Sequence, residues 1–206
     1  MDDKELFLEK LAGLFLLNGA KTFTMDDIAK EFSISKKTLY QFYTNKEALL
    51  EDVLKYKVEK VIGFLLQIDQ KNGNAIEIML LRNKVINEVI ESDKSSFILQ
   101  LIKYYPEVYH NHILFVTDKI DKLITENYLI GMNSGLYRSD LRYQTYIKLY
   151  MTLIFAMDTS PLYKDTDLTE KEADCNVALQ FYLDAIVTDE GKKQLKKIKL
   201  KYEEFN

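Results

Sequence analysis

The sequence predicts an all-α fold in which a three-helix N-terminal domain precedes a larger helical body. Three observations support this prediction. Apolar residues recur at helical spacing along most of the chain, pairs of helix-capping residues mark several helix starts, and no segment alternates convincingly like a strand. The 206 residues include only 2 prolines and 7 glycines, which is typical of long helices. We expect eight or nine helices and place the two domains at residues 1–46 and 47–206.

The composition is that of a soluble globular chain. Its residues are 47% hydrophobic and 29% charged, and the formal net charge is −4. The single cysteine, Cys175, excludes an intrachain disulfide and favours a reducing compartment. The apolar runs, such as residues 14–17, are much shorter than the ~20 residues of a membrane span. The first residues, MDDKE, also lack the basic start of a signal peptide. We therefore expect a cytoplasmic protein with no membrane partner.

The first helix is expected over residues 3–18. Phe7, Leu11 and Phe15 recur there at helical spacing, which gives this helix one apolar face. Gly19 follows the last periodic residue and is expected to end the helix in a left-handed conformation. This helix should brace the next two helices and so complete a three-helix domain.

Residues 24–46 are expected to form two short helices joined by a tight turn, followed by the start of a third helix. Thr24 and Asp27 have the spacing of a capping box at the start of the first short helix. Ser35 can cap the second one. Ser33 lies in the turn between them, where a left-handed conformation is expected and is less comfortable for serine than for glycine.

The two short helices have the composition of a helix-turn-helix. Ala29 supplies the small residue that is needed where the helices cross. The residues expected to fill the wedge between the helices are Ile28, Phe32, Ile34, Leu39 and Phe42. The polar face of the second helix would carry Lys36, Lys37, Thr38, Tyr40 and Gln41. Because lysine neutralises phosphates and glutamine pairs with adenine, this face suits the major groove of DNA. The alternative is an ordinary helical pair within a larger core.

The charge around this motif is basic although the whole chain is acidic. Residues 30–46 contain four lysines and one glutamate, a local net charge of +3. Binding to phosphates depends on local charge, and an acidic remainder disfavours contact between DNA and the wrong surface. The overall acidity therefore does not exclude a DNA-binding protein.

The run IAKEFSISKKTLYQFYTNKEALL resembles the DNA-binding motif of the tetracycline-repressor (TetR/AcrR) family of bacterial transcription regulators. The matching positions are Thr24, Ile28, Ala29, Ser35, Thr38, Leu39, Tyr40, Asn45, Lys46, Glu47, Leu49 and Leu50. Two positions depart from the family pattern. Ser33 stands where glycine is usual, and the pair Phe42-Tyr43 stands where His or Tyr followed by Phe is usual.

The resemblance implies a transcriptional regulator that binds double-stranded DNA, most simply a repressor that a small-molecule effector releases from a palindromic operator. Lys46 would contact a phosphate at the start of the next helix, where the helix dipole adds positive charge. The candidate DNA-binding residues are Thr24, Ser35, Lys36, Lys37, Thr38, Tyr40, Gln41, Tyr43 and Lys46. One recognition helix reads only a few base pairs, so we expect a homodimer that reads two half-sites ~34 Å apart.

Further helices are expected at 45–70, 75–91, 96–104, 106–129, 141–157 and 169–187. Their expected start signals are a capping box of Thr44 with Glu47, Pro106 at a first helical position, Asp140 as a cap, and a capping box of Thr169 with Glu172. Gly131 and Gly135 are expected to bracket a loop.

The C-terminal segment, residues 191–206, is basic, with six lysines against two glutamates. One interpretation is a solvated face on a final helix. The alternative is a surface that contacts DNA or an acidic partner.

The resemblance also implies that the body surrounds the effector pocket and supplies the dimer interface. Aromatic residues are frequent there, which suits an apolar or aromatic effector, although each of them could equally be a core residue. The candidate pocket residues are Phe64, Tyr104, Tyr105, Tyr109 and Tyr150. The candidate dimer residues, on the helices expected at 141–157 and 169–187, are Ile147, Tyr150, Met151, Ile154, Val177, Phe181 and Ile186.

No motif indicates catalysis, a metal or a cofactor. His110 and His112 are the only histidines, and a spacing of two points helical side chains in different directions. Glu107 with His110 matches half of a di-iron motif whose second half is absent. Phosphate-binding glycine loops and cysteine clusters are absent as well. We therefore expect no enzyme activity. The alternative function is an all-α small-molecule-binding protein whose helix-turn-helix does not act on DNA.

Overall fold

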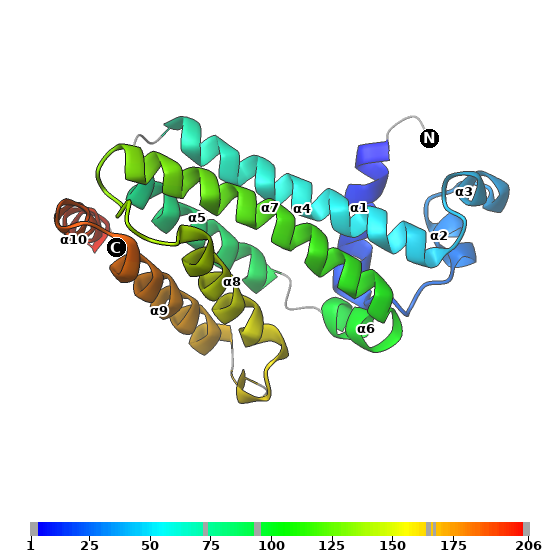
Figure 1. The fold of residues 1–206 in the computed structure, drawn as a ribbon. Coiled ribbons are helices and arrows are strands. Elements are labelled where there is room, and N and C mark those ends of the chain that lie inside the picture. The colour runs from blue at the N-terminus through cyan, green and yellow to red at the C-terminus, as the bar shows by residue number, and fades with distance from the viewer. Residues whose placement is uncertain (1–3, 72–73, 93–95, 164–165, 167, 204–206) are drawn as a thin grey trace. The chain divides into compact units, whose positions relative to one another are not determined.

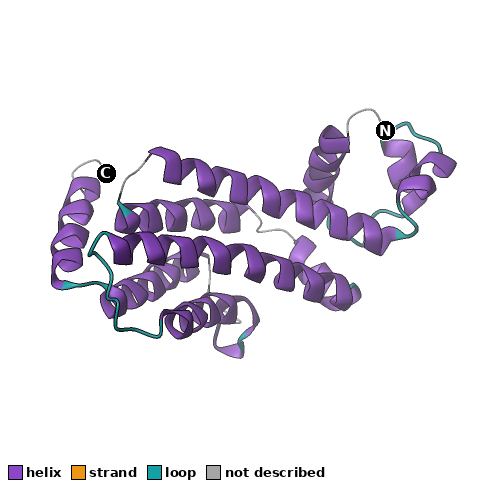
Figure 2. Cartoon of the chain, turned by 45° about the horizontal axis from the view of Figure 1, so that its top comes forward, coloured by secondary structure: helices purple, strands orange, loops and turns teal. Residues whose placement is uncertain are grey.

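The computed structural model describes residues 4–71, 74–92, 96–163, 166 and 168–203, and these residues are helical almost throughout (Figure 1, Figure 2). The helices are α1 (Lys4–Asn18), α2 (Met25–Glu31), α3 (Lys36–Phe42), α4 (Lys46–Lys71), α5 (Ala75–Ser92), α6 (Ser96–Tyr104), α7 (Pro106–Asn133), α8 (Tyr143–Thr159), the 3₁₀ helix η1 (Pro161–Tyr163), α9 (Leu168–Ile186) and α10 (Asp189–Glu203). The predicted all-α class is confirmed. No helix among the described residues is long and apolar enough to cross a membrane.

The chain divides into two compact units. The first comprises residues 1–63 and 89–116, and the second comprises residues 64–88 and 117–206. Helices α1, α2, α3 and α6 belong wholly to the first unit, whereas α8, α9 and α10 belong to the second. Each of α4, α5 and α7 contributes a part to both units.

The first unit is built on one apolar core. Phe15 of α1 and Phe97 of α6 are fully buried and stack with their ring centroids 5.7 Å apart. Leu39 of α3, the second helix of the helix-turn-helix, is buried in the same core. Gly19 ends α1 with φ +82°, as predicted, and its amide donates to the Phe15 carbonyl at 2.7 Å. The helix-turn-helix therefore rests on a continuous core that α1, α4 and α6 complete.

The second unit contains a core rich in stacked tyrosines. Tyr128 stacks on Tyr143 and Tyr150 stacks on Tyr182, each pair with centroids 4.8 Å apart. The Asn127 side chain donates to the Ala75 carbonyl at 2.9 Å and accepts from the Tyr137 hydroxyl at 3.2 Å. Burial raises the pKa of Tyr137 well above its ordinary value, so the ring and its hydroxyl stay neutral in this core.

Three predicted boundaries in the body are wrong. The segment at Gly131 is helical, because α7 continues to Asn133, and the absence of a side chain lets the Tyr137 ring pack against the helix there. Asp140 does not cap α8 but binds Arg138 at 2.8 Å, and Arg142 precedes the helix without a side-chain cap. Thr169 lies inside α9, which begins at Leu168.

Candidate DNA-binding interface

The entry to α2 is fixed by the predicted capping box. Thr24 Oγ1 accepts a hydrogen bond from the Asp27 amide at 3.2 Å, and Asp27 Oδ2 accepts one from the Thr24 amide at 3.0 Å. The side-chain and backbone hydrogen bonds from Thr24 lower the pKa of the Asp27 carboxyl. The box therefore satisfies the Thr24 and Asp27 amides at this helix start over the ordinary pH range.

The turn between α2 and α3 is tight and left-handed. Ser33 has φ +52° and is the one non-glycine residue with positive φ in the described part of the chain. The Ile34 amide then reaches back to the Ala29 carbonyl at 2.9 Å. Ala29 is buried at the crossing of the two helices, as predicted. Serine thus tolerates the conformation expected where the family usually has glycine.

The recognition helix, α3, begins and ends with contacts that hold it on the core. Ser35 Oγ accepts from the Thr38 amide at 3.0 Å, which confirms the predicted cap. Leu39 is fully buried, but Phe42 is 51% exposed, so the prediction that Phe42 faces the core is wrong. The helix ends at Phe42. The next residue, Tyr43, has an extended backbone, and its side chain is buried in place of Phe42.

That next residue is Tyr43, which is only 5% exposed. Its ring stacks on Phe7 at 6.4 Å, and its hydroxyl donates to Asp52 Oδ2 at 2.7 Å. The Lys4 ammonium lies 2.7 Å from the same carboxylate. Burial first, and the Asp52 hydrogen bond second, raise the pKa of Tyr43. Tyr43 therefore joins α1, α3 and α4, and its hydroxyl is already engaged within the fold.

The outer face of α3 is polar and open to solvent. Lys36, Lys37, Tyr40 and Gln41 are all exposed, and Thr38 is partly exposed beside its cap. Lys36 binds Asp26 of α2 at 2.5 Å, and this carboxylate raises the pKa of Lys36. The face therefore combines a tethered lysine with lysine, tyrosine and glutamine side chains that project outward.

Helix α4 begins four residues after the end of α3. The helix begins at Lys46, and Asn45 Oδ1 accepts from the Ala48 amide at 2.8 Å. The predicted capping box of Thr44 with Glu47 is therefore wrong, because the cap lies one residue later. Sequence reasoning missed Asn45 as a cap, although asparagine is among the preferred residues at that position.

Lys46 is partly buried and points into the first unit. Its ammonium donates to the Phe23 carbonyl, just before the Thr24 cap, and lies 5.5 Å from the centroid of the Tyr105 ring. Burial lowers the pKa of Lys46, and the charges of Glu47 and Asp27 oppose that effect. Lys46 thus links the start of α4 to the start of α2.

The five candidate effector residues fall in both units. Tyr104, Tyr105 and Tyr109 lie in the first unit, where Tyr105 and Tyr109 pack on its core and Tyr104 carries the Lys21 ammonium 4.1 Å above its ring. Phe64, which is 57% exposed, and Tyr150, which is buried against Tyr182, lie in the second unit. No pocket inside either unit could be lined by all five.

These features together define a helix-turn-helix protein with a rigidly mounted, solvent-exposed recognition helix. Comparison with known proteins gives the family. Residues 7–53 match the family model of bacterial regulatory proteins of the TetR family. Residues 7–53 therefore form a helix-turn-helix domain of the kind found in this family of transcriptional regulators, which is not a family of enzymes.

One sequence relative and two solved structures are also similar to this chain. The HTH-type transcriptional regulator YhgD of Bacillus subtilis strain 168 is 28% identical over 81% of this chain and 91% of its own length. A transcriptional regulator from Cytophaga hutchinsonii has the same fold, with a TM-score of 0.77 and 16% identity over 91% of this chain and all of that chain. Thermus thermophilus FadR, a TetR-family repressor solved with lauroyl-CoA, has a TM-score of 0.61 and 16% identity over 87% of this chain and 93% of that chain.

Proposed function

We propose that this regulator is a repressor that binds a palindromic operator as a homodimer and leaves it when a small-molecule effector binds. The observation that carries the proposal is the outer face of α3, which is polar and exposed while the helix behind it is capped by Ser35 and anchored by buried Leu39. A rigid mounting lets a recognition helix enter the major groove without losing conformational entropy on binding.

The proposed contacts divide into positioning and reading residues. Gln41 reads an adenine through two hydrogen bonds, and Tyr40 contacts bases or the adjacent backbone. Lys37 and Lys46 neutralise phosphates. The other positioning residues are Thr24 at the start of α2, and Ser35, Lys36 and Thr38 at the start of α3. Tyr43 is left out of the contact set because its hydroxyl is engaged by Asp52.

Dimerisation is supported by an exposed apolar surface on α8 and α9. Leu149 and Leu153 of α8, and Val177 and Phe181 of α9, are all exposed, the last two at 66% each. The two helices pack side by side (Figure 1). Large exposed apolar side chains on two neighbouring helices are typical of an interaction site on a globular protein. We therefore assign these four side chains to the dimer interface.

This assignment changes most of the interface residues expected from the sequence. Ile147, Tyr150, Met151 and Ile186 are buried in the core of their own unit, so they are not available to a partner. Ile154 is partly buried against the same core, and Val177 and Phe181 remain exposed from the expected set. The difference arises because α8 and α9 each carry two apolar faces, and periodicity does not say which face the chain itself covers.

The effector is proposed to act by a shift between two conformations, one of which spaces the recognition helices for successive half-sites. A ligand achieves this only through a different affinity for the two states. FadR, with the same fold, was solved with lauroyl-CoA, whose acyl chain is apolar. An apolar or aromatic effector remains the proposal for this chain, with Phe64, Tyr104, Tyr105, Tyr109 and Tyr150 as the residues to test.

The experiment is selection of duplex DNA from a random pool by the purified protein, followed by sequencing. Enrichment of an inverted repeat is the expected result and would supply the operator for an effector-release screen. The competing function is a small-molecule-binding protein without an operator. Binding to random duplex at low salt separates the two, since a competent face binds it weakly and with steep salt dependence. A flat pool together with no binding at low salt would favour the competing function.

A further inference from the structure

One stripe of α9 is exposed over its whole length and is symmetric about its middle. Glu170, Ala173, Val177, Phe181 and Asp184 are all exposed and follow one another at helical spacing. Glu170 and Asp184 each lie seven residues from Val177, about 10 Å along the helix axis. Ala173 and Phe181 each lie four residues from it. The stripe therefore has its apolar centre at Val177 and a carboxylate at each end.

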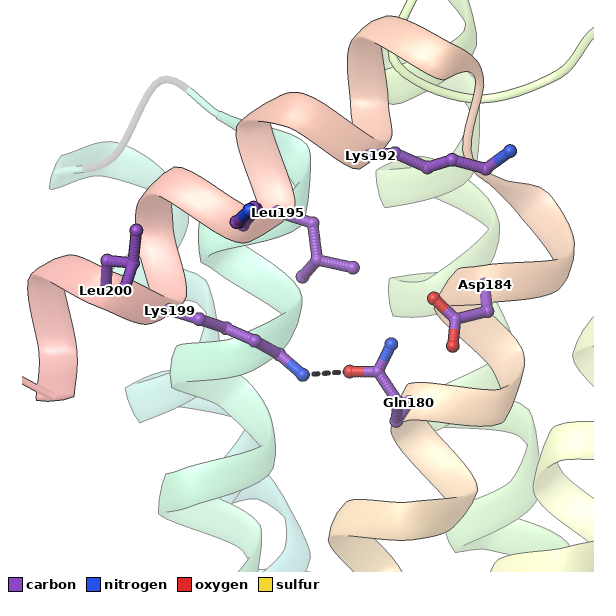
Figure 3. Close-up of a pocket in the computed structure, with 7 residues that line it drawn as sticks. Gln180, Asp184, Lys192, Leu195, Lys199 and Leu200 are labelled. Atoms are coloured by element: carbon purple, nitrogen blue, oxygen red, sulfur yellow. Dashed lines mark hydrogen bonds between the residues drawn. The ribbon is translucent and has the colours of Figure 1, made fainter.

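The two halves of α9 differ in the charge that surrounds them. The N-terminal half carries Glu170, Glu172 and Asp174 against Lys171. The C-terminal half borders an open groove formed with α10, which is lined by Gln180, Asp184, Lys192, Leu195, Lys196, Lys199 and Leu200 (Figure 3). Three lysines thus accompany one carboxylate there. One half is acidic and the other is flanked by basic side chains.

The groove is shaped by contacts within the chain. Lys199 reaches from α10 to the Gln180 side chain, as Figure 3 shows, and Lys192 binds Asp189 at 3.1 Å. Leu195 is buried between the helices, while Leu200 is half exposed at the groove. Lys196 lies between Lys192 and Lys199 on the same face of α10, four residues after one and three before the other. It is therefore the central cation of the groove.

An antiparallel pairing of α9 with a second copy matches these halves. A two-fold axis near Val177 places Phe181 against Ala173 of the partner subunit, a large side chain against a small one. The same axis places the C-terminal half of one α9, which carries Asp184 but borders the three lysines of α10, beside the acidic half of the other. It does so twice because such an interface is isologous. Parallel pairing would instead set acidic half against acidic half.

We propose that, in the dimer, the groove between α9 and α10 of each subunit receives the acidic end of α9 from the partner subunit, with Glu170 of the partner subunit beside Lys196. The inference rests on the proposed dimerisation through α8 and α9 and adds α10 to that interface. It gives the basic C-terminal helix a partner, a second copy of this chain, and it makes dimer register depend on charge as well as on apolar packing.

Sedimentation equilibrium of the full chain at low salt tests this pairing. Lys196→Glu is expected to raise the dimer Kd roughly tenfold, because two exposed ion pairs are each replaced by a like-charge contact. Lys197→Glu is the matched control, since it makes the same charge change on the exposed side of α10 away from the groove lining. Glu170→Lys should weaken the dimer as Lys196→Glu does, and the double variant should return to within about threefold of the parent. High salt should remove the differences.

Two outcomes would overturn the proposal: equal dimer Kd values for Lys196→Glu and Lys197→Glu, or a double variant weaker than both single variants. Val177→Asp separates this failure from failure of the dimer face itself. If Val177→Asp gives monomers while the groove variants have no effect, only the pairing of the groove is wrong. If Val177→Asp leaves the dimer intact, the proposed α8–α9 interface is wrong as well. Circular dichroism of each variant checks that it is folded.

Discussion

Lys46 is the residue for which the fold and the proposed DNA contact make separate, measurable contributions. Its ammonium donates to the Phe23 carbonyl and lies 5.5 Å from the Tyr105 ring centroid. We propose that the same side chain also neutralises a phosphate. Lys46→Met removes the charge and keeps most of the apolar stem, so it tests both contributions with little change in packing volume.

The magnitudes follow from these contacts. A hydrogen bond from a charged donor contributes about 1.5–3 kcal/mol, and a cation–π contact at this range adds about 0.5 kcal/mol. Burial of the charged ammonium is unfavourable, as the lowered pKa of Lys46 indicates, and Lys46→Met removes this cost. Its removal offsets part of that sum. We expect the free energy of unfolding to fall by about 1–2 kcal/mol. Loss of one phosphate contact should reduce the slope of log K against log salt by about 0.9.

The assay pairs chemical denaturation with fluorescence anisotropy on the selected operator over a range of salt concentrations. Lys37→Met is the matched control, because Lys37 is exposed on α3 and its loss should change the salt slope without changing stability. A Lys46→Met protein that loses stability but keeps the parental salt slope would refute the phosphate contact. One that loses salt slope but keeps its stability would refute the structural contribution of the Phe23 contact.

Three further predictions follow from the structure. Tyr43→Phe should lower the free energy of unfolding by about 1–2 kcal/mol, through loss of a partly buried hydrogen bond to a carboxylate, and leave the salt slope of DNA binding unchanged; a reduced slope would return Tyr43 to the contact set. Gly131→Ala should destabilise the protein in denaturant titrations because a Cβ there would lie 2.1 Å from a tyrosine ring, whereas Gly63→Ala, with open space around it, should be neutral or stabilising by up to about 1 kcal/mol. Burial raises the pKa values of Tyr150 and Tyr182, so the stability they provide is present below the ordinary tyrosine pKa of 10.0 and is lost as pH rises above it; denaturation followed from pH 9 upward (roughly one unit below that pKa) should show this loss, and Tyr182→Phe should make it smaller.

Local signals in the sequence predicted the parts of the site that depend on neighbouring residues. The boxes and caps at Thr24, Asp27 and Ser35 join residues three apart, so the pattern that encodes them is contiguous. The left-handed Ser33 follows from the helix-turn-helix pattern in the same way. Phe42 was misplaced because whether a residue at a helix end faces the core depends on where the chain turns, and periodicity does not give that position to within one residue.

The contacts that periodicity missed join residues far apart in the chain. Asn83 of α5 donates to the Asn176 side chain of α9 at 2.7 Å across 93 residues of sequence. The Arg82 guanidinium is buried and donates to the Leu123 carbonyl at 2.9 Å. Polar residues such as these are expected at the surface, and only the tertiary fold supplies the partners that permit their burial.

The predicted domain boundary after residue 46 does not coincide with the first compact unit, because contacts between distant parts of the chain are not visible in a local pattern. Residues 1–46 contain the proposed DNA-contacting groups, and we retain them as the proposed DNA-binding domain. Their core, however, is completed by Phe97 and Leu101 of α6, which lie about fifty residues further along the chain. The Lys21 amide donates to Gln100 of α6 at 2.6 Å, so the loop before α2 is tied to the same helix. A displacement of α6 within this unit would therefore act directly on the loop that positions the helix-turn-helix, without passing through α3 itself.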